Sequence, residues 1–151
     1  MKKNIYIVIA SILMILTGIL RGLGGVLLIL KGNTVPVEPP IIASNLISKL
    51  CGIGLIIVCF LFVYSAYLLL NRKYRKGFKL SWIVIGLFLI GGIVNGYLLF
   101  KNPFVQDQII NFSASILIGI LLLIGKNNLN KTTANKVLPK AGLNGFDWTF
   151  V

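Results

Sequence analysis

The sequence contains, at positions 50–70, the stretch LCGIGLIIVCFLFVYSAYLLL, which carries no charged residue. A helix needs about 20 apolar residues, within a range of roughly 17–25, to cross the ~30 Å hydrocarbon core of a bilayer. Backbone amides inside lipid have to be hydrogen-bonded within their own segment, so an apolar run of this length indicates a helix and not an isolated strand. The stretch therefore predicts a transmembrane helix.

Three further stretches of the same kind surround this one. They cover residues 5–30, 80–100 and 108–125, and Arg21 is the one charged residue within them. Of the 151 residues, 57% belong to the AVILMFWYC set, and the mean hydropathy is +0.94. We expect an all-α integral membrane protein with four transmembrane helices in an up-down-up-down bundle. The membrane domain would cover 1–125, and a polar, mobile cytoplasmic tail would cover 126–151.

The chain has few charged residues, and most of them are positive. It contains fifteen Lys and Arg, three acidic residues and no His, which gives a net charge of +12. In a soluble protein such a balance is typical of nucleic-acid binding. Here eleven of the fifteen cations lie at positions 2–3, 72–79 and 126–140, which four spans put on one side of the membrane. The positive-inside rule places both termini in the cytoplasm. We expect a bacterial inner (plasma) membrane protein whose partner is the lipid bilayer and not nucleic acid.

The composition leaves little material for catalysis. The acids are Glu38, Asp107 and Asp147, and without His most acid–base and metal sites cannot be assembled. Cys51 and Cys59 are eight residues apart on one predicted helix. Their separation along the axis is about 12 Å, too far for a disulfide. We therefore expect no catalytic residue, no metal, no cofactor and no enzymatic activity.

Arg21 is the residue that topology does not explain. An Arg at the centre of a membrane helix costs about 2.5–3.5 kcal/mol on insertion scales, so it usually faces the protein interior. At 100° per residue, Arg21 shares a helix face with the small residues Gly18 and Gly25, which favours a position inside the bundle. Arg21, Asn95 and Asp107 are our candidates for binding an anionic ligand. A structural clamp, and an Arg that snorkels to the outer interface, are the alternatives.

Glycines mark the expected helix contacts. Small residues let transmembrane helices approach closely, and we expect packing inside the bundle, with a GxxxG-mediated homodimer as the alternative. The candidates for helix packing are Gly18, Gly22, Gly25, Gly92 and Gly96.

An internal repeat is suggested by the first and third spans. Residues 17–23 (TGILRGL) align with residues 91–97 (GGIVNGY), which superposes Arg21 on Asn95. The alignment predicts two tandem helical hairpins of the same orientation, with these two side chains facing each other across a pseudo-axis. Parallel repeats of this kind occur in some transporters.

The N-terminus also fits a second interpretation. Its basic start, apolar run and Gly22-Leu23-Gly24 resemble a cleaved signal peptide, although Arg21 and the apolar residues 26–30 favour an uncleaved span.

Three classes of function remain open from the sequence. The first is a non-enzymatic accessory or interaction protein, such as a small subunit or an immunity-type protein that contacts another membrane protein. The second is a carrier or binding protein for a lipid or other anionic amphiphile, which would use Arg21 in the bundle. An intramembrane enzyme is the third.

Overall fold

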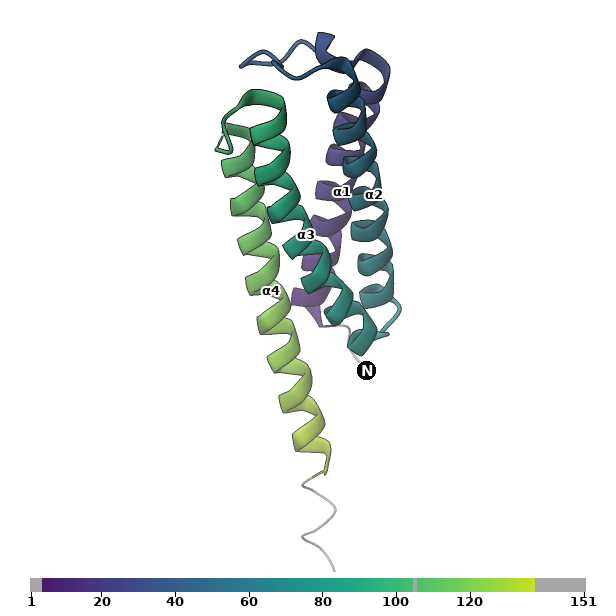
Figure 1. The fold of residues 1–151 in the computed structure, drawn as a ribbon. Coiled ribbons are helices and arrows are strands. Elements are labelled where there is room, and N and C mark those ends of the chain that lie inside the picture. Colours follow the sequence, from purple (N-terminus) through teal and green to yellow (C-terminus); the bar gives the residue numbers. More distant parts are fainter. Residues whose placement is uncertain (1–3, 105, 138–151) are drawn as a thin grey trace, which may run out of the picture.

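The fold is all-helical over the part of the chain that the structure describes (Figure 1). The computed structural model describes the backbone of residues 4–104 and 106–137, and their side chains except at 106, 107 and 131–137. Its elements, in chain order, are α1 (Ile5–Lys31), a short 3-10 turn η1 (Gly32–Thr34), α2 (Asn45–Leu70), α3 (Tyr74–Phe100) and α4 (Gln106–Val137).

Four of these helices are long and apolar enough to cross a membrane. This confirms the prediction of an all-α protein with four candidate transmembrane helices. Large apolar side chains cover the outside of the helices, as the exposed Leu20, Phe60 and Ile90 illustrate. A soluble protein rarely exposes apolar surface on this scale, whereas a bilayer solvates it.

The helices extend beyond the apolar stretches that predicted them. Helix α2 begins at Asn45 because the Ser44 side chain accepts a hydrogen bond from the Ile47 amide, which satisfies an orphan donor of the first turn. Helix α3 ends at Phe100, because the next residue, Lys101, adopts the left-handed conformation (φ 56°) ahead of Pro103. Hydropathy reports the apolar length of a span, whereas capping groups fix where its helix begins and ends.

Helix α4 continues past the predicted end of the fourth span at residue 125. The polar segment 126–137, which the sequence assigned to a mobile tail, is helical, and residues 138–151 of that tail lie outside the described residues. The described part of α4 runs to Val137.

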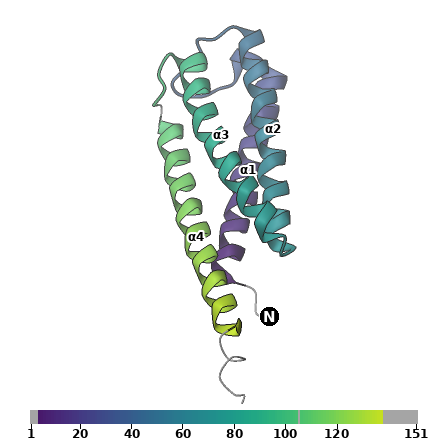
Figure 2. The same cartoon turned by 60° about the horizontal axis from the view of Figure 1, so that its bottom comes forward.

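Each helix packs against the next one in the chain, and α4 returns to pack against α1. The two ends of this ring differ (Figures 1 and 2). At one end, the segment 32–44 contacts α3 through a hydrogen bond from the Ile42 amide to the Leu99 carbonyl. We call this the loop end. At the other, the terminal end, the Asn4 side chain donates to the Gly125 carbonyl.

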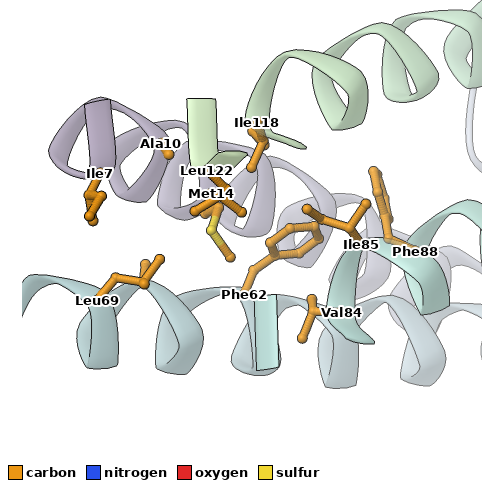
Figure 3. Packing of buried hydrophobic residues seen from close by; sticks show 11 residues of the cluster. Ile7, Ala10, Met14, Phe62, Leu69, Val84, Ile85, Phe88, Ile118 and Leu122 are labelled. Atoms are coloured by element: carbon orange, nitrogen blue, oxygen red, sulfur yellow. The ribbon is translucent and has the colours of Figure 1, made fainter. Parts of the chain in front are cut away.

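The main hydrophobic core lies toward the terminal end. There Phe62 of α2 and Phe88 of α3 make an edge-to-face contact, with ring centroids 5.3 Å apart. Figure 3 shows how side chains from all four helices meet around this pair. The buried members of this cluster are Ile7, Ala10, Met14, Phe62, Ala66, Leu69, Val84, Ile85, Phe88, Ile118 and Leu122.

Candidate functional site: a cavity with a polar wall

Between this core and the loop end, the bundle contains a cavity of about 290 Å³. All four helices and the segment 32–44 contribute to its wall. The lining residues are Arg21, Gly24, Leu27, Leu28, Val35, Val37, Ile41, Gly54, Leu55, Val58, Leu87, Phe88, Gly91, Gly92, Asn95, Leu99, Phe100, Gln108 and Asn111. Most of them are apolar, and four are polar: Arg21, Asn95, Gln108 and Asn111.

Arg21 lies partly buried at this wall and is fixed by a side chain of α4. Its Nη2 donates a hydrogen bond to Oδ1 of Asn111. The Asn111 Nδ2 in turn donates to Oε1 of Gln108 at 3.0 Å. Both carboxamides are buried, with exposed fractions of 5% for Asn111 and 8% for Gln108. The three side chains form one hydrogen-bonded series that holds the guanidinium at the cavity.

The glycine at position 92 makes room for this series. A Cβ on Gly92 would lie 2.6 Å from Oε1 of Gln108, well inside contact distance. A side chain at this position would displace the end of Gln108, which accepts the hydrogen bond from Asn111. Glycine at position 92 thus accommodates the buried pair of carboxamides.

Of the three predicted ligand-binding residues, two lie at the cavity. Arg21 and Asn95, which the proposed repeat superposes, both line the cavity. The side chain of Asp107, the third candidate, lies outside the described residues. Sequence reasoning missed Gln108 and Asn111, the buried partners on α4. The available signal was the spacing of Gln108, Asn111 and Ser115, which puts three polar residues on one face of an apolar span.

The glycines of α1 that were predicted to pack lie against α2. A Cβ on Gly18 would meet Cβ of Phe62 at 3.0 Å, and one on Gly22 would meet Sγ of Cys59 at 2.8 Å. Gly25 faces the backbone of Gly52 still more closely. These small residues therefore serve the contact between α1 and α2, and the structure places them inside the bundle.

Gly96, the remaining glycine predicted to pack, lies near the end of α3. A Cβ there would approach the carbonyl oxygens of Asn102 and Pro103 at 2.9 and 3.1 Å. Because neither oxygen belongs to a flexible side chain, this position favours glycine. It lets the chain turn tightly from α3 toward α4.

Three other glycines keep the cavity open. A Cβ built on Gly24, Gly54 or Gly91 would have no heavy atom within 4 Å, apart from neighbours in its own chain segment. The three come from α1, α2 and α3, and each lines the cavity. A side chain at any of them would fill cavity volume without displacing protein atoms.

The chemistry of this arrangement is that of binding. A guanidinium carries five N–H donors in a planar fork that matches carboxylate and phosphate oxygens, and Asn and Gln add neutral donors and acceptors. The apolar part of the wall, with Val58, Leu87 and Phe88, suits hydrocarbon. An amphiphile with an anionic end combines both kinds of surface.

Comparisons with known proteins give no relative from which a role can be transferred: no family model, no curated protein and no solved structure matches the chain.

Proposed function

We propose that this chain is a non-enzymatic multi-pass membrane protein that binds an anionic amphiphile in the cavity, with Arg21 contacting the anionic group. The observation that carries the proposal is the placement of Arg21 at the wall of a cavity of about 290 Å³. Pockets for small molecules range from about 300 to 1,000 Å³ and combine apolar walls with a few oriented polar groups. The volume of this cavity is just below that range, and its wall has the same combination of apolar and polar groups.

The proposed topology is up-down-up-down across a bacterial inner membrane, with both termini in the cytoplasm. It is supported by the eleven cations at 2–3, 72–79 and 126–140. The loop end of the bundle is then external, and the cavity lies in the outer half of the membrane. A ligand at Arg21 would thus belong to the outer leaflet.

An anion is favoured by the dielectric surroundings. The attraction between opposite charges grows as water is excluded, from about 1 kcal/mol at 4 Å in bulk water to about 4 kcal/mol at an effective dielectric constant of 20. Arg21 is partly buried, and the carboxamide of Asn111 orients its guanidinium. A phosphate or carboxylate therefore gains more here than at the exposed cations of the helix ends.

The test is native mass spectrometry of protein extracted in dodecyl maltoside, a neutral detergent. Three probes are compared: dodecyl phosphate, dodecanol and inorganic phosphate. Dodecanol tests binding of the hydrocarbon chain alone, and inorganic phosphate tests binding of the anion alone. Dodecyl phosphate should bind at a one-to-one ratio and more tightly than either of the others. Equal binding of dodecyl phosphate and dodecanol would refute a role for the anion.

Two variants assign the binding to Arg21. Arg21→Gln should lower the affinity for dodecyl phosphate at least tenfold. Lys31→Gln is the matched control, because it also removes a cation from α1 but at an exposed position at the helix end. Equal loss in both variants would indicate a general charge effect and contradict the proposal. A stable complex with another membrane protein, and no bound amphiphile, would instead favour the accessory or immunity-type function.

A further inference from the structure

Three of the four helix pairs in the ring contact each other at the level of the cavity. Helices α1 and α2 meet at Gly25 and Gly52, where a Cβ on either would lie 2.6 Å from the carbonyl oxygen of the other. Helices α3 and α4 meet where Gly92 faces Gln108. Helices α1 and α4 are joined by the hydrogen bond from Arg21 to Asn111. A ligand that entered at one of these three places would have to break the contact there.

The contact between α2 and α3 is closed only toward the terminal end. There the Ser65 and Ser81 hydroxyls are 2.7 Å apart, and Phe62 packs on Phe88. Both views show α2 and α3 close together near the terminal end and farther apart near the loop end (Figures 1 and 2). In the divergent part, Gly54 of α2 is exposed and has open space where its side chain would be.

On α3, the residues that face this divergent part are also exposed or next to open space. Leu87 of α3 is 48% exposed, and Gly91, one turn further along α3, has open space like Gly54. Both line the cavity. We call the opening that Gly54 and Val58 border on α2, and Leu87 and Gly91 border on α3, the lateral window.

The loop end of the cavity is covered. The segment 32–44 contributes Val35, Val37 and Ile41 to the lining, and the hydrogen bond from Ile42 to Leu99 joins it to α3. The lateral window therefore lies between this cover and the Phe62–Phe88 contact, on the side of the bundle that faces lipid.

The position of Arg21 relative to the window suggests how a ligand enters. In a ring of four helices, the contact between α2 and α3 lies opposite the contact between α4 and α1. Arg21 and Asn111 form that opposite contact, so they make up the back of the cavity as seen from the window. An anionic group that enters from the bilayer reaches the guanidinium last, with its hydrocarbon chain behind it.

From this geometry we infer that the ligand is a bilayer lipid with a small anionic headgroup, which enters headgroup first through the lateral window. The inference rests on the proposed function and adds its ligand class and route. A cavity of about 290 Å³ accepts a headgroup and the first part of a chain, while the remaining hydrocarbon stays in the membrane.

The first experiment blocks the window. Gly54→Phe and Gly91→Phe each place a ring at its edge, and Gly86→Phe is the matched control, because Gly86 lies on α3, also has open space, and is not part of the lining. Binding of dioleoyl phosphatidic acid is measured by native mass spectrometry, together with the melting temperature of each variant. Both window variants should bind at least tenfold more weakly than wild type, and Gly86→Phe should bind like wild type.

The outcomes separate this inference from the proposed function. If Arg21→Gln loses phosphatidic acid while Gly54→Phe and Gly91→Phe keep it, the lateral route is wrong and the site at Arg21 stands. If wild type and Arg21→Gln bind phosphatidic acid equally, the proposed function fails, and the inference fails with it.

A second measurement uses wild-type protein and so does not depend on whether a variant folds. Phosphatidic acid with a diazirine in one acyl chain is photocrosslinked in neutral phosphatidylcholine vesicles, and the labelled peptides are mapped. Labelling that dodecyl phosphate competes away should fall on the edges of the window, in 54–58 and 87–91. Competed labelling confined to α1 and α4 would overturn the inference.

Discussion

Gly25 and Gly52 pack backbone to backbone, so that a Cβ built on either residue would lie 2.6 Å from the carbonyl oxygen of the other. This reciprocal contact brings α1 and α2 together on one side of the cavity. The flanking residue Gly24 has open space at the same level, because it faces the cavity and not α2. The two consecutive glycines therefore differ in role: Gly25 allows close packing against α2, whereas Gly24 borders the cavity.

The first prediction compares these neighbours. Gly25→Ala should lower the free energy of unfolding by about 1–3 kcal/mol, the usual range for overpacking, because the clashing atom is a backbone oxygen. Gly24→Ala should leave stability unchanged or raise it by up to about 1 kcal/mol, since Ala is the better helix former. Thermal unfolding in one detergent measures both. Equal stability of the two variants would rule out the close contact.

A second prediction separates binding from stability at the polar wall. Asn111→Asp places a carboxylate where the carboxamide now accepts from Arg21, which creates an ion pair at the cavity. The new carboxylate competes with an anionic ligand for the guanidinium. We expect a loss of dodecyl phosphate affinity of tenfold or more, about 1.4 kcal/mol. The melting temperature is measured alongside, because the carboxylate can no longer donate a hydrogen bond to Gln108. Ser113→Ala, on the exposed face of α4, is the control and should bind normally.

The buried serine pair gives a third prediction. Ser81 donates to the Gly77 carbonyl at 2.8 Å and shares a 2.7 Å hydrogen bond with Ser65, and both hydroxyls are fully buried. Ser81→Ala should destabilise the protein by about 1 kcal/mol, because it leaves the Ser65 hydroxyl with a poorer partner. The double variant with Ser65→Ala should cost less than the sum of the single variants. Additive effects would indicate that the two hydroxyls are not coupled.

The fourth prediction concerns orientation in the membrane. In a background with Cys51→Ser and Cys59→Ser, single cysteines are introduced at the exposed positions Glu38 and Arg75. A membrane-impermeant maleimide should label Glu38→Cys in intact cells and label Arg75→Cys only after permeabilisation, because the positive-inside rule puts residues 72–79 in the cytoplasm. The reverse pattern would invert the topology, and the cavity would then belong to the inner leaflet.

The number of helices could be predicted from the sequence because the hydropathy of a segment depends only on the residues within it. An uncharged run such as 50–70 has one stable state in lipid, whatever the rest of the chain does. Helix ends were less accessible: the polar start of α2 at Asn45 depends on the Ser44 cap, and the polar end of α4 extends to Val137. Hydropathy measures the length of the apolar segment. It does not detect a helix whose backbone hydrogen bonds continue into the polar residues beyond that segment.

Arg21 and Asn95 could be assigned to the candidate site from the sequence, and Arg21 gave the stronger signal. Arg21 is identified because a charged side chain inside a membrane span costs free energy. This cost can be recognised without knowing which residues surround Arg21. Gln108 and Asn111 are uncharged and lie near a predicted span end, where polar residues are ordinary. Their role depends on which residues of α1 face α4, and that depends on helix rotation and contact.

The sequence by itself thus determined that the chain is helical, how many helices are suited to a membrane, and that Arg21 is a costly residue inside a span. These conclusions follow from transfer energies between water and hydrocarbon, which sum along a segment. Only the tertiary structure decided that Gly25 closes a helix contact while Gly24 opens a cavity, and that Asn111 orients Arg21. Such assignments depend on distances between residues far apart in the chain, and no local energy specifies them.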